Sequence, residues 1–352
     1  MDGVDIAYCE FDMPDETLNK KTKIHFAIKI AETIPYPERW MTRLTHLNEQ
    51  PIFLYPKTDA YYGKYLGQLV TDFIKKNNLT VDLISSHGHT IFHQPENGFT
   101  AQIGDGAAIQ AETNLPVVCN FRTVDVALGG QGAPLVPVGD HGLFSEYDTC
   151  LNLGGFANIS FTENDLLKAF DICPCNTILN HVAAWKNLPF DDKGKIAENG
   201  KVNTDLLTEL NELEFYKKHD AKSLGKEWVN EKFWPVVKKF DSLNDEDLMA
   251  TFAEHISIQI SIVIHSANAK NILLTGGGAL NDFLIHLITK KTSSKMIIPE
   301  LNIINYKEAL IFAYLGVLRV RNEINVMSSV TGAIKNSIGG ALYGNFFPHK
   351  AS

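Results

Sequence analysis

The feature that most constrains the fold of this chain is a glycine triplet that lies between an apolar strand and a helix. Ile272–Thr275 is a short apolar run typical of a buried strand, and Gly276, Gly277 and Gly278 follow it directly. After the triplet, apolar residues recur at helical spacing over Phe283–Ile288. A buried strand that passes through a short turn into a helix is the repeating step of α/β folds, so this region predicts one.

The rest of the chain repeats this alternation and is long enough for two domains. We expect strands at Gly3–Phe11, Ile24–Ile30, Val81–Ile84 and Leu115–Phe121, and helices at Leu66–Ile74, Gly106–Thr113, Asp247–Ala269 and Lys307–Val320.

The length of 352 residues is about twice the usual domain size. We therefore expect one domain of residues 1–124 plus 327–352 and another of residues 125–326. The Gly/Pro-rich stretch Gly129–Pro137 is the expected hinge, and strands Thr149–Leu153 and Ala157–Phe161 form an expected hairpin.

Charge and apolar content exclude several classes of protein. The 32 Lys and Arg residues against 41 Asp and Glu residues give a formal net charge of −9, the wrong sign for sequence-independent binding to nucleic acid or to an anionic membrane. The longest apolar runs, such as Ile256–Ile264, are shorter than the ~20 residues that span a bilayer, so we expect no transmembrane segment. Five scattered cysteines and the lack of an apolar leader predict reduced thiols in a cytoplasmic protein.

Two glycine turns are candidates for binding phosphate groups. Backbone amides in a glycine-rich turn can approach a nucleotide closely, and the triplet at Gly276 precedes a helix whose amides could also face it. Gly154 and Gly155 form the turn of the expected hairpin. Close packing at the triplet, or a positive φ in the hairpin turn, would explain the same glycines without any ligand.

Several polar residues could carry chemistry, and each also has a structural interpretation. His87, His89 and His93 invite a metal site, but no Cys or carboxylate group completes a ligand set, so we favour local hydrogen bonds or contact with substrate in a loop. The thiols of Cys173 and Cys175 are one residue apart rather than two, which favours small buried side chains over a redox pair.

A carboxylate and an ion pair remain open in the same way. Asp171 ends a strand-like run, where it could be a catalytic group or the cap of a turn. Arg122 and Asp125 follow the expected strand Leu115–Phe121, where they could be catalytic or an ordinary surface ion pair.

A series of motifs in fixed order resembles the anhydro-N-acetylmuramic acid kinase family. The motifs are Ser86-His87-Gly88-His89-Thr90, Gln102-Ile103-Gly104-Asp105, Asn120-Phe121-Arg122, Asp125 through Leu128 to Pro137, Asn152-Leu153-Gly154-Gly155-Phe156-Ala157-Asn158, Lys222 to Glu227, Gly276 to Gly278 with Asn281, Glu308-Ala309, and Ser329 to Ala333. They span nearly the whole chain, and the string from Leu128 to Pro137 is highly specific.

The resemblance implies a fold, a reaction and a set of site residues. The fold is the actin-like sugar kinase fold, with two α/β domains around a nucleotide cleft. The reaction converts ATP, water and 1,6-anhydro-N-acetylmuramic acid into N-acetylmuramic acid 6-phosphate and ADP, with Mg²⁺ assisting phosphoryl transfer, in the recycling of cell-wall sugar. By the family pattern, Asp171 is the general base and Arg122, Asp125 and Glu308 contact the sugar. Asp2, Gly3, Val4, Asp5, Gly154, Gly155, Gly276, Gly277 and Gly278 contact the nucleotide.

Three departures from the family pattern bear on these expectations. The family's first phosphate loop, Gly-Thr-Ser-Leu-Asp-Gly-Val-Asp after a strand, corresponds here to a sequence that begins Met1-Asp2-Gly3-Val4-Asp5, so we expect a late start codon or a truncation. Cys173 and Cys175 replace two family glycines, and Asn120 replaces an aspartate. The alternatives are a kinase for another amino or anhydro sugar, or an actin-like relative that binds nucleotide or sugar without turnover. A homodimer is compatible with the sequence.

Overall fold

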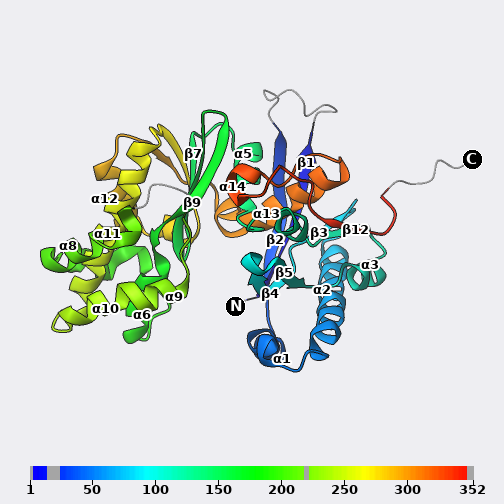
Figure 1. Ribbon diagram of the computed structural model, residues 1–352, viewed down its shortest axis with the longest axis horizontal. Helices are drawn as coiled ribbons and strands as arrows, with labels where there is room; N and C mark the ends of the chain where they lie inside the picture. Colours follow the sequence, from blue (N-terminus) through cyan, green and yellow to red (C-terminus); the bar gives the residue numbers. More distant parts are fainter. Residues whose placement is uncertain (1–2, 14–23, 218–221, 347–352) are drawn as a thin grey trace, which may run out of the picture. The chain divides into compact units, whose positions relative to one another are not determined.

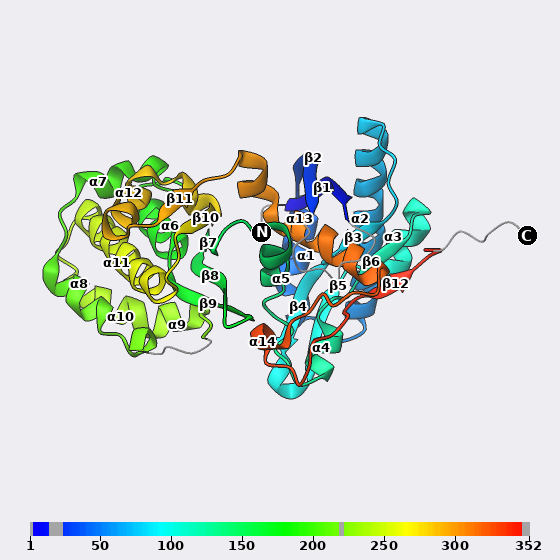
Figure 2. The same cartoon turned by 90° about the horizontal axis from the view of Figure 1, so that it is seen from above.

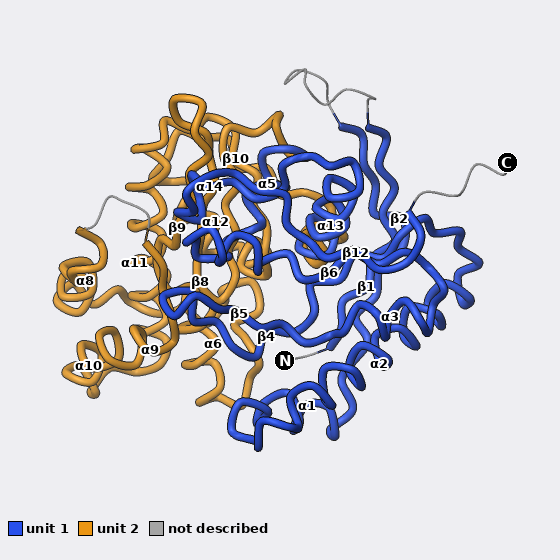
Figure 3. The backbone as a smooth tube through the Cα atoms, turned by 45° about the vertical axis from the view of Figure 1, so that its right-hand side comes forward, with its two compact units in different colours: residues 1–143, 308–352 blue, residues 144–307 orange. Residues whose placement is uncertain are grey.

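The computed structural model describes residues 3–13, 24–217 and 222–346 and divides the chain into two units. Unit 1 comprises residues 1–143 and 308–352, and unit 2 comprises residues 144–307 (Figure 3). The boundaries thus lie at 143/144 and 307/308, not at 124/125 and 326/327 as the sequence suggested. The expected hinge Gly129–Pro137 belongs entirely to unit 1. It leads into α5 (Val136–Leu143), where a Cβ on Gly139 would meet Ile311 at 2.5 Å.

Unit 1 is a mixed α/β unit with three small sheets (Figure 1). In the first sheet, β1 (Gly3–Asp12) pairs with β2 (His25–Pro35). The second sheet has the strand order β12 (Ala341–Tyr343), β6 (Val117–Cys119), β3 (Ile84–Ser86). In the third sheet, β4 (His89–Gln94) pairs with β5 (Phe99–Ile103). The helices are α1 (Glu38–His46), α2 (Leu54–Asn77), α3 (Gly106–Thr113), α4 (Thr123–Ala127), α5, the part of α13 (Leu301–Val320) that follows residue 307, and α14 (Ser328–Thr331).

The core of unit 1 forms where α1 and α2 pack against β5 and α3. Trp40 of α1 meets Tyr62 of α2 edge to face with ring centroids 5.2 Å apart, and both are buried. The helix α2 ends at Asn78, whose left-handed conformation lets its amide reach the carbonyls of Ile74 and Lys75. Asparagine tolerates this conformation and closes helices in this way, which explains why the helical periodicity stops there.

Unit 2 is built on one five-stranded sheet. Its order is β11 (Lys295–Ile297), β10 (Asn271–Thr275), β7 (Thr149–Leu153), β8 (Phe156–Glu163), β9 (Leu166–Pro174). The strands β11, β10 and β7 are parallel, whereas β7, β8 and β9 form an antiparallel meander. The helices are α6 (Asn176–Trp185), α7 (Lys195–Asn199), α8 (Thr204–Asn211), α9 (Lys226–Trp228), α10 (Trp234–Val237), α11 (Asp245–Ser266) and α12 (Asp282–Lys291).

The long helix α11 is the central element of the unit 2 core. This helix, yellow in Figure 2, contacts α6, α7, α8 and α12. Asn244 caps its first turn by accepting a hydrogen bond from the amide of Asp247 at 2.8 Å. By length and composition, α11 and α13 could each cross a membrane, but 72% of the apolar window of α11 is buried inside the protein. An apolar helix can instead be buried against other helices in the core of a protein, and α11 is such a helix.

Two local expectations are wrong. His89 and His93 lie on strand β4 rather than in a loop, because β4 pairs with β5. Pro95 follows β4 and begins the turn between the two strands. The strand expected at Val81–Ile84 lies at Ile84–Ser86, where it pairs in parallel with β6. The strand was predicted too early in the sequence because Val81 and Leu83 are apolar.

Candidate active site

In unit 2, the two glycine turns lie at the same edge of the sheet. The strands β7 and β10 are parallel, with Thr275 opposite Asn152, so the turns that follow them leave the sheet side by side. The carboxyl ends of parallel strands are the usual place for ligands in α/β sheets. The structure therefore brings together Gly154-Gly155 and Gly276–Gly278, which lie more than a hundred residues apart in the sequence.

The Gly154-Gly155 turn is joined to the start of α6 through its carbonyl groups. The carbonyl of Gly154 accepts the amide of Asn176 at 3.1 Å, and that of Gly155 accepts the amides of Cys175 at 2.9 Å and Thr177 at 3.1 Å. Neither glycine has a positive φ, so that structural explanation is wrong. Within the described residues, no hydrogen bond uses the amides of Gly154 and Gly155, which leaves two N–H donors for a ligand.

The glycine triplet approaches β7 closely. Gly276 has φ +79° and ψ 161°, a conformation open essentially to glycine alone. A Cβ on Gly276 would lie 2.6 Å from the Oδ1 of Asn152 and 2.8 Å from the carbonyl of Leu153. By contrast, a Cβ on Gly277 would meet nothing closer than the Nδ2 of Asn176 at 3.8 Å. The first glycine is thus required by the fold, while the second has open space beside it.

Two polar residues beside the glycine turns were not predicted as site residues from the sequence. Asn176 donates from Nδ2 to the carbonyl of Leu153 at 3.0 Å and lies beside Gly277 and Gly278. Lys307 is buried, and its Nζ donates to the Oγ1 of Thr275 at 3.3 Å, next to the triplet. The position of Lys307 immediately before Glu308 was the only sequence signal for it.

Asp171 lies in β9 beside a β-bulge. The pairing of β8 with β9 shifts there, because Ala157 faces Cys173 and Asn158 faces Asp171, so Ile172 is the extra residue. Bulges redirect side chains and are common next to active sites. The Oδ2 of Asp171 accepts the amide of Leu224 at 2.8 Å, and its own amide donates to the carbonyl of Lys222 at 3.0 Å.

The surroundings of Asp171 act in two directions on its pKa. Burial raises the pKa of Asp171 above its ordinary value, while hydrogen bonds from the Leu224 amide and the Ser223 side chain oppose that shift. A carboxylate with a raised pKa is a stronger base than an exposed one. The cap role considered for Asp171 does not match its position, because the amide it binds lies 53 residues away in the sequence.

Cys173 and Cys175 are both fully buried in the apolar core of unit 2. Both are free thiols, and burial raises the pKa of Cys175 to about 12. A protonated, buried thiol is inert, so the prediction of small buried thiols is confirmed.

In unit 1, a histidine and an arginine meet at the carboxyl ends of two parallel strands. Ser86 of β3 lies opposite Cys119 of β6, and His87 and Arg122 follow these two strands. Arg122 donates from Nε to the Nε2 of His87 at 3.0 Å and from Nη2 to the same atom at 2.8 Å. Burial lowers the pKa of Arg122, and the negative charge of the Glu308 carboxylate opposes that shift.

Arg122 and Asp125 do not pair with each other but hold the same backbone segment. The Nη1 of Arg122 donates to the carbonyl of Gly132 at 2.7 Å, and the Oδ2 of Asp125 accepts the amide of Gly132 at 2.8 Å. The Oδ1 of Asp125 accepts the hydroxyl of Thr331 at 2.7 Å. Asp125 is fully buried with both oxygens engaged, so the surface ion pair considered from the sequence is absent and a structural role is favoured.

A cavity of about 770 Å³ in unit 1 collects several predicted site residues. Gly3, Val4 and Asp5 of β1 line it, together with His87 and Glu308. Burial raises the pKa of Glu308, and the positive charge of Arg122 opposes that shift. Asp2 lies outside the described residues.

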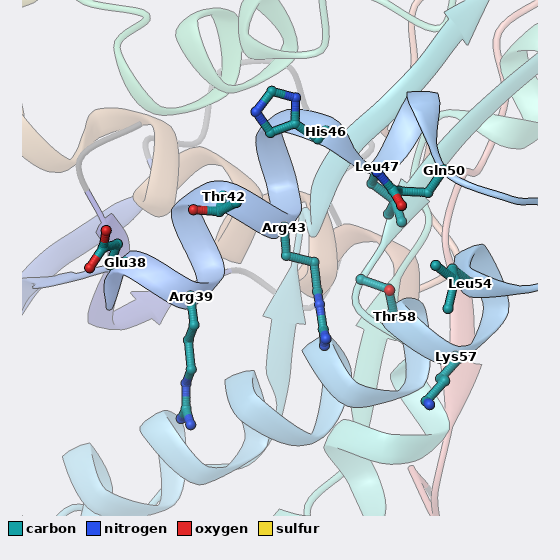
Figure 4. Close-up of a pocket in the computed structure, with 10 residues that line it drawn as sticks. All are labelled: Glu38, Arg39, Thr42, Arg43, His46, Leu47, Gln50, Leu54, Lys57 and Thr58. Atoms are coloured by element: carbon teal, nitrogen blue, oxygen red, sulfur yellow. The ribbon is translucent and has the colours of Figure 1, made fainter.

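A second hollow in unit 1, of about 660 Å³, contains none of the predicted site residues (Figure 4). Arg39 and Arg43 of α1 line it with Lys57 of α2. Of these two hollows of unit 1, the one with Glu308 therefore contains predicted site residues and the basic one does not.

Three comparisons relate the chain to known proteins. The family model for anhydro-N-acetylmuramic acid kinase matches residues 1–345. The anhydro-N-acetylmuramic acid kinase of Sulfurovum sp. is 31% identical over 359 residues, covering 97% of this chain and 96% of the relative, and that of Haemophilus influenzae is 30% identical over 378 residues, covering 97% and 95%. Among solved structures, the ROK hexokinase from Thermus thermophilus aligns with a TM-score of 0.37 and 12% identity over 89% of this chain and 99% of that chain.

Proposed function

The chain belongs to the anhydro-N-acetylmuramic acid kinase family, and from that premise we propose which of its residues carry the reaction. The activity is that of an ATP-dependent sugar kinase. It opens the 1,6-anhydro bridge of anhydro-N-acetylmuramic acid and phosphorylates O6. The alternative of a relative without turnover is not favoured. The residue roles below are our assignment.

We assign the nucleotide to the two glycine turns of unit 2. The free amides of Gly154 and Gly155 supply N–H donors for phosphate oxygens, and the open space beside Gly277 admits a ligand against the backbone. Gly276 and Gly278 keep the second turn close to β7 and so fix its position. Oriented donors of this kind stabilise the charge that develops during phosphoryl transfer.

We assign the water-activating base to Asp171. Opening the bridge requires water to attack the anomeric carbon while the bond from that carbon to O6 breaks. The carboxylate takes one proton of the water, the hydroxyl remains on the anomeric carbon, and O6 takes the γ-phosphoryl group of ATP as ADP leaves. The Leu224 amide and the Ser223 side chain orient the carboxylate of Asp171, and its oxygens keep further lone pairs that can receive the proton.

We assign sugar binding to Arg122 and Glu308 in unit 1. The guanidinium has five N–H donors, of which three are used by His87 and Gly132, so two remain for oxygen atoms of the sugar. Glu308 lines the 770 Å³ cavity and accepts hydrogen bonds from sugar hydroxyls. Asp125 supports this set through Gly132 rather than touching the sugar.

Mg²⁺ would travel with the nucleotide phosphates and neutralise part of their charge. Within the described ranges 3–13, 24–217 and 222–346, no group of three or more His, Cys, Asp or Glu side chains could hold a metal ion. We therefore assign no protein ligand to it. A cytoplasmic location is part of this proposal, because the nucleotide and the recycled sugar meet there.

The convergence of the two glycine turns at one sheet edge is the observation that best supports this function. The test is mass spectrometry of the product formed from 1,6-anhydro-N-acetylmuramic acid, ATP and Mg²⁺ in oxygen-18-labelled water. We expect the mass of substrate plus one phosphoryl group plus one water, with one labelled oxygen outside the phosphate. A product that gains a phosphoryl group without water, or a preference for another sugar, contradicts the assignment.

A further inference from the structure

His87 is in contact with Arg122 in a geometry that fixes the arginine side chain. Two N–H groups on one edge of the guanidinium end on a single ring nitrogen, at 3.0 and 2.8 Å. Both bonds need a lone pair on Nε2, so the imidazole is neutral with its proton on Nδ1. A third bond, from Nη1 to the carbonyl of Gly132, holds the other side of the guanidinium.

The imidazole itself has little freedom to move. It packs against the ring of Phe312 on α13, with centroids 4.5 Å apart, and Phe312 is buried. His87 also follows β3 directly, and β3 is held by parallel pairing with β6. His87 and Arg122 therefore follow two strands of the same sheet.

The charged groups around His87 favour this neutral state. Burial and the positive charge of Arg122 lower the pKa of His87 to about 4, and His89 on β4 acts in the same direction. Glu308 on α13 interacts with Arg122, and Asp5 on β1 with Glu308. A neutral acceptor orients the guanidinium without cancelling its charge, whereas a carboxylate at this position would do both.

We propose that His87 is a positioning residue that aims the two free N–H donors of Arg122 at the sugar. This inference rests on the proposed role of Arg122 in sugar binding. It assigns His87 a function although the residue does not itself take part in bond making or breaking. The predicted loss on removing His87 is therefore a loss of sugar affinity.

The test compares His87→Phe with His87→Gln in steady-state kinetics. Phenylalanine keeps a ring against Phe312 but removes the acceptor, so KM for the sugar should rise about tenfold or more while KM for ATP stays within twofold. Glutamine places an amide oxygen near the position of Nε2 and should restore most of the sugar affinity. It also keeps the proposal testable should His87→Phe not fold. His46→Gln, at an exposed histidine on α1, is the matched control and should change neither constant.

A second arm separates this inference from the proposed function. If Arg122→Lys raises the sugar KM and His87→Phe does not, the positioning role is overturned while sugar binding by Arg122 stands. If neither variant raises the KM for the sugar, the proposed role of Arg122 in sugar binding is refuted, and the positioning role of His87 is refuted with it. In the double variant we expect less than the product of the two single effects, because both remove one interaction. Imidazole nitrogen-15 chemical shifts at pH 6 should show Nδ1 protonated and Nε2 free; protonated Nε2 would refute the geometry.

Discussion

Asp171 shows how the position of one side chain separates a base from a turn cap. Its side chain is half-buried at a bulge, and its carboxylate is held by the Leu224 amide, which lies on a segment remote in sequence. Replacement by asparagine keeps the shape and much of the hydrogen bonding but cannot accept a proton from water. We expect Asp171→Asn to lower kcat by roughly 10²–10⁴-fold with the melting temperature retained.

The control for this substitution is the same chemical change at a site without a proposed role. Asp165 lies in the turn between β8 and β9 with φ +62°, a conformation that asparagine adopts readily. Asp165→Asn should leave kcat and the melting temperature unchanged. A kcat near that of the wild type in Asp171→Asn would remove Asp171 from the mechanism, and a higher KM alone would make it a binding residue.

At the same scale, the sequence identified residues better than it identified their partners. Asp171, Arg122 and Glu308 were predicted as site residues from family motifs. In the structure Asp171 and Arg122 are half-buried, and Glu308 lines the open cavity of unit 1. The contact of His87 with Arg122 could not be predicted, because it depends on the parallel pairing of β3 with β6. The same holds for Asp125, whose full burial follows from contacts with Gly132 and Thr331.

Among the elements, the turn after β10 allows two needs for glycine to be tested separately: close packing at Gly276 and space for the nucleotide at Gly277. Alanine at Gly276 would need a left-handed φ and would place its Cβ 2.6 Å from Asn152, so Gly276→Ala should destabilise unit 2 by about 1–3 kcal/mol. Alanine at Gly277 meets no such obstacle. We expect Gly277→Ala to fold with an unchanged melting temperature but to raise KM for ATP about tenfold.

Isothermal titration with a non-hydrolysable ATP analogue checks both variants. The decisive comparison is the affinity of Gly277→Ala, since its stability does not confound the result. Wild-type affinity in that variant would mean that the triplet serves packing alone, which is the structural interpretation left open by the sequence. Weaker binding without loss of stability would support contact between the nucleotide and this backbone.

The elements themselves were predicted unevenly, and the reason is physical. Apolar residues at helical spacing predicted α11 and the second half of α2, because both helices bury apolar side chains over several turns. The hairpin of β7 and β8 was found because a Gly-Gly turn separates two apolar runs. The β4 strand was missed, because its six residues alternate histidine, threonine and apolar side chains with little contrast.

On the scale of the whole molecule, each unit contains a buried neutral histidine that ties stability to pH. In unit 2, the Nδ1 of His255 lies 2.7 Å from the Oδ1 of Asn211, and Nε2 lies 2.9 Å from the hydroxyl of Tyr216. Burial lowers the pKa of His255 to about 3, and burial with the charge of Arg122 lowers that of His87 to about 4. Both values lie below that of an unfolded histidine, near 6.5.

We therefore expect stability to fall as the solution is made more acidic than pH 6.5. In that range the unfolded chain binds protons at His87 and His255 while the folded chain does not, so the free energy of unfolding rises with pH. The contribution of His255 is on the order of 3 kcal/mol between pH 7 and pH 4.5, by the value of 1.36 kcal/mol for each pKa unit. Three carboxyl groups with raised pKa values, Asp59, Asp171 and Glu308, act in the opposite direction near the acid end.

His255→Gln isolates the histidine term, because glutamine keeps a polar group beside Asn211 and Tyr216 but does not titrate in this range. We expect the variant to be less stable at pH 7 but to lose less stability than the wild type on acidification. Urea unfolding followed by hydrogen exchange, which reports each unit separately, measures this at pH 7, 6 and 4.5. His286→Gln, at an exposed histidine on α12, controls for a change of residue type. An equal loss of stability in His255→Gln and wild type would show that His255 is not the group that titrates, and would assign the acid sensitivity of unit 2 to its carboxyl groups.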